Sequence, residues 1–495
     1  MQQLPYYPFI TRGGPVRRKL TYDAVVYTED GHYFAEDGNG HIFCQDSQTS
    51  CIQEAISYVA QLGGGRISIK SGTYAINSTI NINNTRQLII EGEQNTVLEA
   101  ASNIVMFQVN TGNFPAYPVT PVVEFRHIIF DGNGYSTNAI YVTNGSWQSN
   151  IVSCTFRNFQ NFAVVYSQAY SHRVLNSIFT NNYGGIYMTN QANDIRIEYT
   201  IFEPNSYADV MIEAPAEGIT ISNCWMEVSS PQTIGHIYIH TVASYNLINI
   251  NIQNIRFYSG TSIYVDGNGT TFDVNVVANY FNATQAINAT NVTGIVSRWK
   301  IIGNNFNEAT QYGINVSKME NSTIVGNFFL AKDSWYGIYG DLYQTAINDN
   351  VFMNYGSTTS STAIYIPAGD LVTIVGNTFL YIVNGIYYGG SNGNDIVVAH
   401  NSFEDVTTPI SGNPIIIGQN GGYITVNSGQ AIISSGSTSV TVNHGLSCTP
   451  SKVLITPLGQ PSGNLWISNI TNTSFAINIS TAPSANLSVA WLAEC

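Results

Sequence analysis

Five ionisable side chains in the middle of the chain have types and spacings that suit acid–base chemistry. They are Asp209, Glu213, His236, His240 and Asp266. They form two files, that is, sets of equivalent positions in successive segments: Asp209 with His236, and Glu213 with His240 and Asp266. Neighbouring members of a file are 26 or 27 residues apart. If such segments stack as strands about 4.8 Å apart, Glu213 and Asp266 lie about 9.6 Å apart with His240 between them. Inverting glycosidases keep their acid and base about 6.5–9.5 Å apart, which leaves room for water.

We therefore predict that Asp266 and Glu213 act as general acid and base in glycoside hydrolysis. His236 and His240 would face solvent and position the substrate or tune the carboxylates, with Asp209 in the same file as His236. The alternative is a solvated cluster of ordinary cross-strand pairs. A metal site built from His236, His240 and the carboxylates is a weaker alternative, because the chain has no ligand-spacing motif for a metal. We therefore predict no metal site and no other cofactor.

A file of tyrosines is the second candidate for function. Tyrosine follows the apolar centre of a strand at Tyr141, Tyr187, Tyr238, Tyr264, Tyr339, Tyr365 and Tyr387. A tyrosine ring offers an apolar face to a sugar and a hydroxyl group to its polar edge, which suits binding of an extended glycan. We predict that substrate contacts Tyr187, Tyr238, Tyr264, Tyr339 and Tyr365. The alternatives are burial of the file between chains of an oligomer and the ordinary preference of tyrosine for strands.

Both candidates depend on a repeat of about 23 residues. An aromatic residue ends a short apolar strand at Phe130, Phe156, Phe179, Phe202, Trp225, Phe257, Phe281, Phe306, Phe329, Phe352, Phe379 and Phe403. Asparagine stands two residues earlier at Asn223, Asn279, Asn304, Asn327, Asn350, Asn377 and Asn401. A second strand with an apolar centre, such as Ile140 or Ile338, follows each aromatic residue. A unit this short cannot bury its apolar face alone, so it must stack on its neighbours.

The repeat predicts an all-β fold, a single-stranded right-handed parallel β-helix over residues 43–415. A capping helix is expected near residues 50–62, with Ser50 as its N-cap and Gly63–Gly65 as its end. Residues 1–42 are interpreted as an arm rich in Tyr, Pro and Arg. Residues 416–495 lose the repeat, and their alternating apolar runs predict a small antiparallel β-sandwich.

Bulk properties limit the partners. The net charge of −14 argues against binding to duplex nucleic acid. No stretch of about 18 apolar residues exists, so we predict no membrane span, and the start lacks the apolar part of a signal peptide. Cys44 could bridge to Cys51 and Cys448 to Cys495, but the sequence leaves the state of both pairs open. Cys154 and Cys224 are expected to be buried thiols.

The passage from IQEAI through GGGRISIKSGTY to LIIEGEQNTVL resembles the opening of the pectate-lyase-like superfamily of right-handed β-helices. The terminal passage VTVNHGLSCTPSKVLITPLG is similar to the small β-domain that ends many viral tail-fibre and tailspike proteins. The resemblance implies homotrimers, an N-terminal arm that binds the particle, and a body that binds or cleaves surface polysaccharide. The pectin-cleaving signatures N-T-D, D-D, G-H-G and R-I-K are absent from the sequence, so we do not expect pectin chemistry.

We interpret the chain as a spike or fibre protein on the surface of a virion that recognises host cell-surface glycans. Its expected partners are a polysaccharide or glycoprotein glycan, two further copies of itself in a homotrimer, and other virion proteins through the arm. Whether it also cleaves the glycan is left open. One alternative is a secreted polysaccharide lyase or glycoside hydrolase, and another is a surface adhesion protein without catalysis. The sequence does not predict which sugar is bound.

Overall fold

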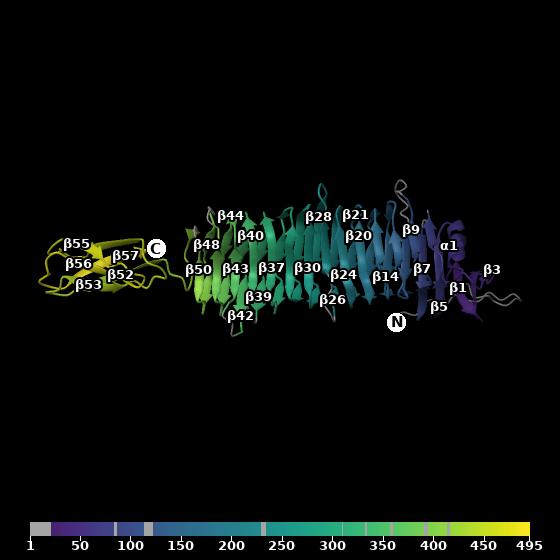
Figure 1. The fold of residues 1–495 in the computed structure, drawn as a ribbon, viewed down its shortest axis with the longest axis horizontal. Coiled ribbons are helices and arrows are strands. Elements are labelled where there is room, and N and C mark those ends of the chain that lie inside the picture. Colours follow the sequence, from purple (N-terminus) through teal and green to yellow (C-terminus); the bar gives the residue numbers. More distant parts are fainter. Residues whose placement is uncertain are drawn as a thin grey trace, which may run out of the picture. The chain divides into compact units, whose positions relative to one another are not determined.

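The computed structural model describes residues 21–83, 87–112, 122–228, 234–308, 310–331, 334–356, 360–390, 395–412 and 416–495. The chain forms two compact units, Met1–Tyr238 and Ile239–Cys495, and each is described by itself. In the described part of both units, almost all regular structure is β-strand, with one helix (Figure 1). The predicted all-β fold of stacked parallel strands is confirmed.

Three columns of parallel strands build the solenoid coils of the first unit. The first column contains β5 (Gly72–Ile76), β8 (Thr96–Ala100), β11 (Ile129–Asp131), β15 (Thr155–Arg157), β19 (Ile178–Thr180), β23 (Ile201–Phe202) and β26 (Trp225–Glu227). The second contains β6 (Ile80–Asn83), β9 (Val105–Asn110), β12 (Asn138–Val142), β16 (Phe162–Ser167), β20 (Asn182–Thr189) and β24 (Asn205–Glu213). The third contains β4 (Gly65–Ile69), β7 (Gln87–Gly92), β10 (Val122–Arg126), β14 (Ser149–Val152), β18 (Arg173–Leu175), β22 (Arg196–Glu198) and β25 (Ala216–Ser222).

The second unit repeats this arrangement. Its first column contains β29 (Arg256–Tyr258), β32 (Tyr280–Asn282), β36 (Asn305–Asn307), β39 (Phe328–Ala331), β42 (Val351–Asn354), β46 (Thr378–Leu380) and β49 (Ser402–Glu404). Its second contains β30 (Thr261–Gly267), β33 (Gln285–Val292), β37 (Tyr312–Glu320), β40 (Tyr336–Tyr343), β43 (Thr362–Ile366), β47 (Asn384–Tyr388) and β50 (Thr408–Ser411). Its third contains β28 (Asn246–Gln253), β31 (Thr270–Val277), β35 (Lys300–Ile302), β38 (Thr323–Val325), β41 (Ala346–Asn348), β45 (Thr373–Val375), β48 (Val397–Ala399) and β51 (Ile416–Ile417).

Shorter strands lie at the turns of the coils. They are β13 (Ser146–Trp147), β17 (Ala169–Tyr170), β21 (Ala192–Asn193), β34 (Val296–Ser297) and β44 (Gly369–Asp370). The boundary between the two units falls inside β27 (Gly235–Thr241).

Buried phenylalanine rings fill the first column and stack from coil to coil. In the first unit Phe130, Phe156, Phe179 and Phe202 stack with ring centroids 4.6–5.1 Å apart. In the second unit Phe257, Phe281, Phe306, Phe329, Phe352, Phe379 and Phe403 stack at 4.4–5.1 Å. The prediction of Trp225 in this column is wrong by one residue, because the buried Met226 pairs with Phe202. Trp225 lies on the outer side, where its indole N–H donates to Glu227.

A buried asparagine ladder lines the turn before the first column in the second unit. Side-chain amides donate to the next side-chain oxygen along Asn279, Asn304, Asn327, Asn350, Asn377, Asn401 and Asn420. Each step also includes a bond from the backbone N–H to that same oxygen. The predicted ladder is confirmed and extended by one member. Asn223 lies in the first unit, where its side-chain amide donates to the Ser222 hydroxyl.

The N-terminal end differs from the predicted arm of residues 1–42. Within residues 21–42, β1 (Ala24–Glu29) pairs with β2 (His32–Asp37), which pairs with β3 (Ile42–Asp46). Because β1 also pairs in parallel with β4, this part of the chain belongs to the first coil. The four basic residues of the arm, Arg12, Arg17, Arg18 and Lys19, lie outside the described residues.

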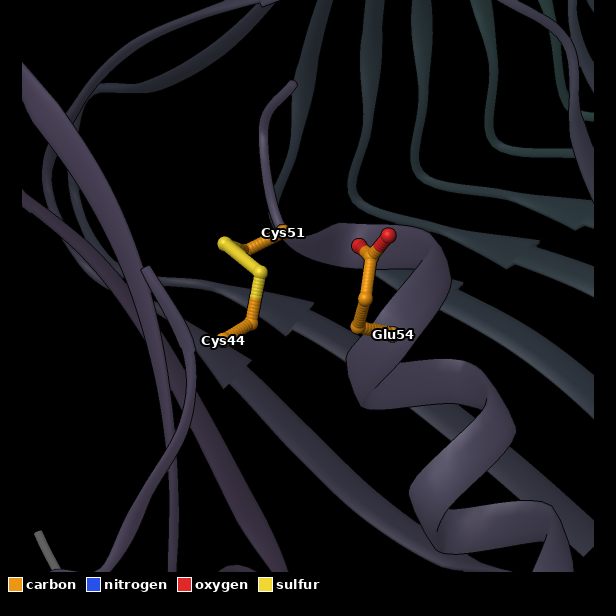
Figure 2. Close-up of side chains that lie close together, drawn as sticks. All are labelled: Cys44, Cys51 and Glu54. Carbon is orange, nitrogen blue, oxygen red and sulfur yellow. A yellow bond between two sulfur atoms is a disulfide. The ribbon is translucent and has the colours of Figure 1, made fainter. Parts of the chain in front are cut away.

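The capping helix α1 (Ile52–Gln61) buries Ile52, Ala55, Ile56 and Val59, as its apolar stripe predicts. Its N-cap is Cys51 rather than the predicted Ser50, and Cys51 makes no side-chain cap bond. A Cys44–Cys51 disulfide fixes Cys51 at this position, beside Glu54 in the first turn (Figure 2). These three residues form the only compact group of potential metal ligands among the described residues. Because both sulfurs are bonded to each other, the group does not provide thiolate ligands.

The C-terminal segment forms two three-stranded antiparallel sheets. One contains β52 (Val426–Ile433), β57 (Leu487–Glu494) and β54 (Lys452–Pro457), and the other β53 (Ser439–Asn443), β56 (Ser474–Ile479) and β55 (Leu465–Ser468). Their inner faces share one core that includes Phe475, Ile477, Val489 and Trp491. A Cys448–Cys495 disulfide holds the end of the chain to this domain. The predicted start at residue 416 is slightly early, because Ile416–Ile417 still pairs with β48.

Cys154 and Cys224 are buried free thiols, as predicted. Burial raises the pKa of both thiols to about 12, so they stay protonated at neutral pH. Within the described ranges, no helix combines the length and the hydrophobicity needed to cross a membrane.

Candidate functional site

His240 and Asp266 form a hydrogen-bonded pair on the second unit. His240 Nδ1 lies 2.6 Å from Asp266 Oδ1, and the two side chains are 34% and 24% exposed. The Thr241 hydroxyl donates to the backbone carbonyl of Asp266, which fixes β30 beside the end of β27. The pair is therefore reachable from solvent, as the prediction for these two residues requires.

Asp209 and His236 also pair, but inside the first unit. His236 Nδ1 lies 2.5 Å from Asp209 Oδ2, and both side chains are fully buried. The second carboxylate oxygen accepts from the Asn205 amide at 2.7 Å. The prediction that His236 faces solvent is wrong, and Asp209 shares its buried file. Solvent and substrate do not reach this pair in the structure, so its visible role is packing.

The position of Asp209 and His236 in the repeat explains their burial. Both stand directly before the apolar centre of a second-column strand, Val210 and Ile237. In nine other coils this position holds a small buried residue: Ala139, Ala163, Gly185, Ser262, Ala286, Gly313, Gly337, Ala363 or Gly385. The alternation of inward and outward side chains expected of a strand therefore fails here, because two consecutive side chains point inward where the chain leaves the turn. The run of small residues was a signal in the sequence that this file is tightly enclosed.

Glu213 lies at the end of β24 and is partly exposed. The Tyr187 hydroxyl donates to Glu213 Oε2 at 2.8 Å, and the Thr189 hydroxyl donates to Oε1 at 2.9 Å. Burial, with a further contribution from the Glu213 charge, raises the pKa of Tyr187 to about 12. Tyr187 therefore remains a hydrogen-bond donor at neutral pH, and the carboxylate is held in a fixed orientation.

An aromatic surface surrounds Tyr187 in the first unit. Tyr183 and Tyr207 stack with centroids 4.8 Å apart, and Phe162 packs against Tyr187 at 5.3 Å. Tyr238, predicted to contact substrate, is only 6% exposed and packs its ring edge against Tyr207. The prediction of an outward Tyr238 is wrong, because the neighbouring ring covers it.

Within each unit, the predicted catalytic residues make the following contacts. Asp209 pairs with His236, Glu213 is bound by Tyr187 and Thr189, and His240 pairs with Asp266. The expected separation of about 9.6 Å between Glu213 and Asp266 stays a prediction.

A ladder of stacked tyrosines lies on the second unit. Tyr339 of β40 stacks on Tyr365 of β43 at 5.0 Å, and Tyr365 stacks on Tyr387 of β47 at 4.8 Å. The rings are within 12° of parallel, and the three residues are directly opposite one another in the register. Tyr264 occupies the same file, but Asn288 and Asn315 separate it from Tyr339. We call Tyr339, Tyr365 and Tyr387 the tyrosine ladder.

A groove of 480 Å³ lies on the same unit, on strands that carry the ladder. It is lined by Thr310, Gln311, Tyr312, Ser334, Trp335, Tyr336, Ser360, Thr362 and Asn384. Tyr312 and Tyr336 stack at 5.5 Å, and Tyr336 meets Tyr339 of the ladder edge to face at 5.3 Å. The sequence analysis missed this groove. A usable signal was present, because Tyr312 and Tyr336 both stand two residues before an isoleucine centre.

No protein-family model matches this chain, and no curated protein sequence matches it. Phage tailspike structures are similar to it. A mutant tailspike of E. coli bacteriophage HK620 in complex with a pentasaccharide is 12% identical, covers 90% of this chain and 89% of its own, and has a TM-score of 0.48. The tailspike gp49 from Pseudomonas phage LKA1 is 12% identical, covers 91% and 94%, and also has a TM-score of 0.48.

An enzyme module is similar as well. The A-module of the mannuronan C-5 epimerase AlgE6 from Azotobacter vinelandii is 12% identical, covers 75% of this chain and 93% of its own, and has a TM-score of 0.40. At such identities a likeness concerns the fold alone, because one solenoid architecture carries many activities.

Proposed function

We propose that this chain is a spike or fibre protein of a virus particle that recognises host cell-surface glycans through the tyrosine ladder. The ladder is the observation that carries the proposal. Its three rings present a continuous aromatic edge, and Tyr387 is 38% exposed. Aromatic groups that are apolar on one side and hydroxylated on the other suit sugar rings, which have the same two characters.

The chemistry of the ladder supports binding at neutral pH. Burial, followed by the neighbouring Tyr387, raises the pKa of Tyr365, so its hydroxyl group remains a donor. The groove beside the ladder adds hydroxyl and amide groups from successive coils. An extended glycan lying along the coils would meet the same kinds of group at each step.

The assembly around this surface is part of the proposal. Three copies of the chain would form the spike, and the basic residues before residue 20 would contact other virion proteins at the particle. The two alternatives, a secreted glycan-cleaving enzyme and a surface adhesion protein, share the glycan contact and differ in location and chemistry. Chromosomal neighbours that encode capsid or tail proteins would favour the particle, whereas an upstream apolar leader would favour secretion.

The proposal is tested with an array of purified cell-surface polysaccharides. The native chain should bind at least one of them, and Tyr365→Ala should weaken that binding about tenfold or more, because it interrupts the middle of the ladder. Tyr245→Ala is the matched control, since Tyr245 is 52% exposed and lies outside the ladder and the groove. Equal binding by the native chain and Tyr365→Ala would refute a role for the ladder.

A further inference from the structure

The groove beside the tyrosine ladder contains a buried donor without a partner. Trp335 is 3% exposed, and its indole Nε1 has no hydrogen-bond partner among the residues that the structure describes. A buried polar group left unpaired is destabilising, so native proteins rarely keep one without a reason. An acceptor that enters the groove would remove this cost.

The indole is held firmly in place. Its six-membered ring lies against Gly337, where an added Cβ would come within 2.7 Å of Trp335 Cη2. The ring packs edge to face against Phe329 and Phe352 of the buried aromatic column, with ring centroids 6.4 and 6.5 Å apart. The backbone carbonyl of Trp335 accepts from the Thr362 N–H, so the main chain is held as well as the ring. A small adjustment of either therefore does not bring a hydrogen-bond partner to Nε1.

An acceptor without a partner lies on the adjacent strand. Asn315 is 7% exposed, and its Oδ1 has no partner in the described part of the chain. Asn315 stands opposite Tyr339 in the register, so it continues the file of the tyrosine ladder by one coil. One buried unpaired donor and one buried unpaired acceptor therefore lie on neighbouring coils, close to the stacked aromatic rings. A sugar hydroxyl group can accept the first bond and donate the second.

The described residues that line the groove are uncharged. Among its described lining residues are hydroxyl, amide and aromatic side chains, with no Lys, Arg, His, Asp or Glu. The hydroxyl groups of Ser334 and Ser360, on neighbouring coils, hydrogen-bond to each other at 2.8 Å. This bond fixes two hydroxyl groups at the edge of the groove. None of the described lining residues would give a carboxylated sugar a cationic partner in exchange for its lost hydration.

Charged groups near the ladder do not change this conclusion. Lys318 on β37 is 2.6 Å from Glu320, so its charge is already paired. Asp341 follows Tyr339 by two residues on β40 and would repel an acidic sugar when ionised. The chain as a whole carries a net charge of −14, which disfavours the approach of a polyanion.

We propose that the groove and the ladder together bind an uncharged glycan, whose hydroxyl groups pair with Trp335 Nε1 and Asn315 Oδ1. This inference rests on the proposed glycan-binding function and specifies its ligand class. It excludes glycans in which every residue at the groove carries a carboxylate, such as polymers of uronic or sialic acid.

The test compares two sets of purified polysaccharides on the array, one uncharged and one rich in uronic or sialic acid. The native chain should bind members of the uncharged set. Trp335→Phe keeps an aromatic ring but removes Nε1, and it should weaken that binding about two- to tenfold, as expected for one hydrogen bond. Because the smaller phenylalanine ring leaves a cavity in the packed core, the melting temperature should also fall, so the affinity is the deciding measurement.

Trp299→Phe is the matched control. Trp299 is also fully buried in the second unit, but its Nε1 already donates to the Thr271 hydroxyl at 2.8 Å. Trp299→Phe should therefore lower the melting temperature and leave glycan affinity unchanged. A Trp335→Phe variant with lowered stability and native affinity would overturn the inference.

The outcomes separate this inference from the function on which it rests. Binding confined to the acidic set, and lost in Tyr365→Ala, would keep the glycan-binding function and refute the uncharged ligand. Binding of the uncharged set that Tyr365→Ala abolishes but Trp335→Phe does not affect would refute the role of Nε1 alone. Absence of binding to both sets would refute the glycan-binding function and the inference together.

Discussion

Single residues in this chain show that burial can remove side chains of acid–base type from contact with solvent and substrate. Asp209 and His236 have the types expected of an acid–base pair, yet they occupy a file that nine other coils fill with alanine, glycine or serine. A hydrogen-bonded Asp–His pair fits there because its members bond to each other and Asp209 also accepts from the Asn205 amide. Glu213 and Asp266, in contrast, remain partly exposed and keep the capacity to meet a substrate.

The acid and base predicted from the sequence are tested by paired substitutions. Glu213→Gln and Asp266→Asn keep the shape of each side chain and remove its proton-transfer capacity. If the chain hydrolyses glycosides with these groups, each variant should lose at least about a hundredfold in turnover, measured as release of reducing ends from a bound glycan. Turnover that survives in both variants would contradict the assignment.

His172 provides a pH-dependent contribution to stability. Burial lowers the pKa of His172 to about 4, and the neutral ring accepts from the Ser149 N–H while its Nε2 contacts the Ser146 carbonyl. An unfolded chain protonates this ring near pH 6.5, so between pH 6.5 and 4 the unfolded state binds more protons. Stability should therefore fall as the pH falls through this window, by roughly 3 kcal/mol, and this loss should level off below pH 4.

The measurement for His172 is the melting temperature of the native chain and of His172→Gln between pH 7 and 4. Glutamine keeps a donor and an acceptor but does not titrate in this range. The variant should show a smaller decrease across the window. Identical curves for the two proteins would show that other groups cause the loss.

At the scale of elements, two ladders hold the coils in register. The phenylalanine column supplies apolar burial, whereas the asparagine ladder satisfies the backbone at the turn that precedes each strand of this column. Asn350 illustrates the second role. Its Oδ1 accepts from the backbone N–H and the side chain of Asn327, and its amide donates to Ile324 and Asn377.

Asn350→Ala should destabilise the second unit by about 3 kcal/mol, because it leaves several buried donors and acceptors unpaired at once. Asn291→Ala serves as the control, since Asn291 is exposed and its amide makes one bond to the Tyr264 hydroxyl. The control should change stability by less than about 0.5 kcal/mol. Urea unfolding of the three proteins measures the differences, and equal stability of Asn350→Ala and native chain would refute the structural role of the ladder.

At the scale of the whole molecule, the proposed spike requires three chains of 54.0 kDa. Light scattering after size-exclusion chromatography should therefore give a mass of three times that value, about 162 kDa. The N-terminal arm is not required for this mass if trimer contacts lie along the body, so a chain that starts at residue 21 should remain trimeric. A mass of about 54 kDa at micromolar concentration would contradict the proposed trimer.

The sequence alone determined the solenoid, the position of α1 and the asparagine ladder, since each depends on a local period or on a short apolar stripe. A stacked repeat brings equivalent positions together whatever the details of a single coil. The error at Trp225 shows the limit of this argument, because spacing alone does not distinguish which of two adjacent large residues faces inward.

Only the tertiary structure decided which side chains reach solvent and which polar groups lack a partner. His236 is buried because the turn encloses it, and Tyr238 is buried because the ring of Tyr207 covers it. The alternation of side chains along a strand predicts neither result. The unpaired, buried Nε1 of Trp335 and the groove that this residue lines depend on packing between residues from several coils. Periodicity fixes the neighbours of a residue, whereas close packing among those neighbours fixes its exposure and its remaining hydrogen bonds.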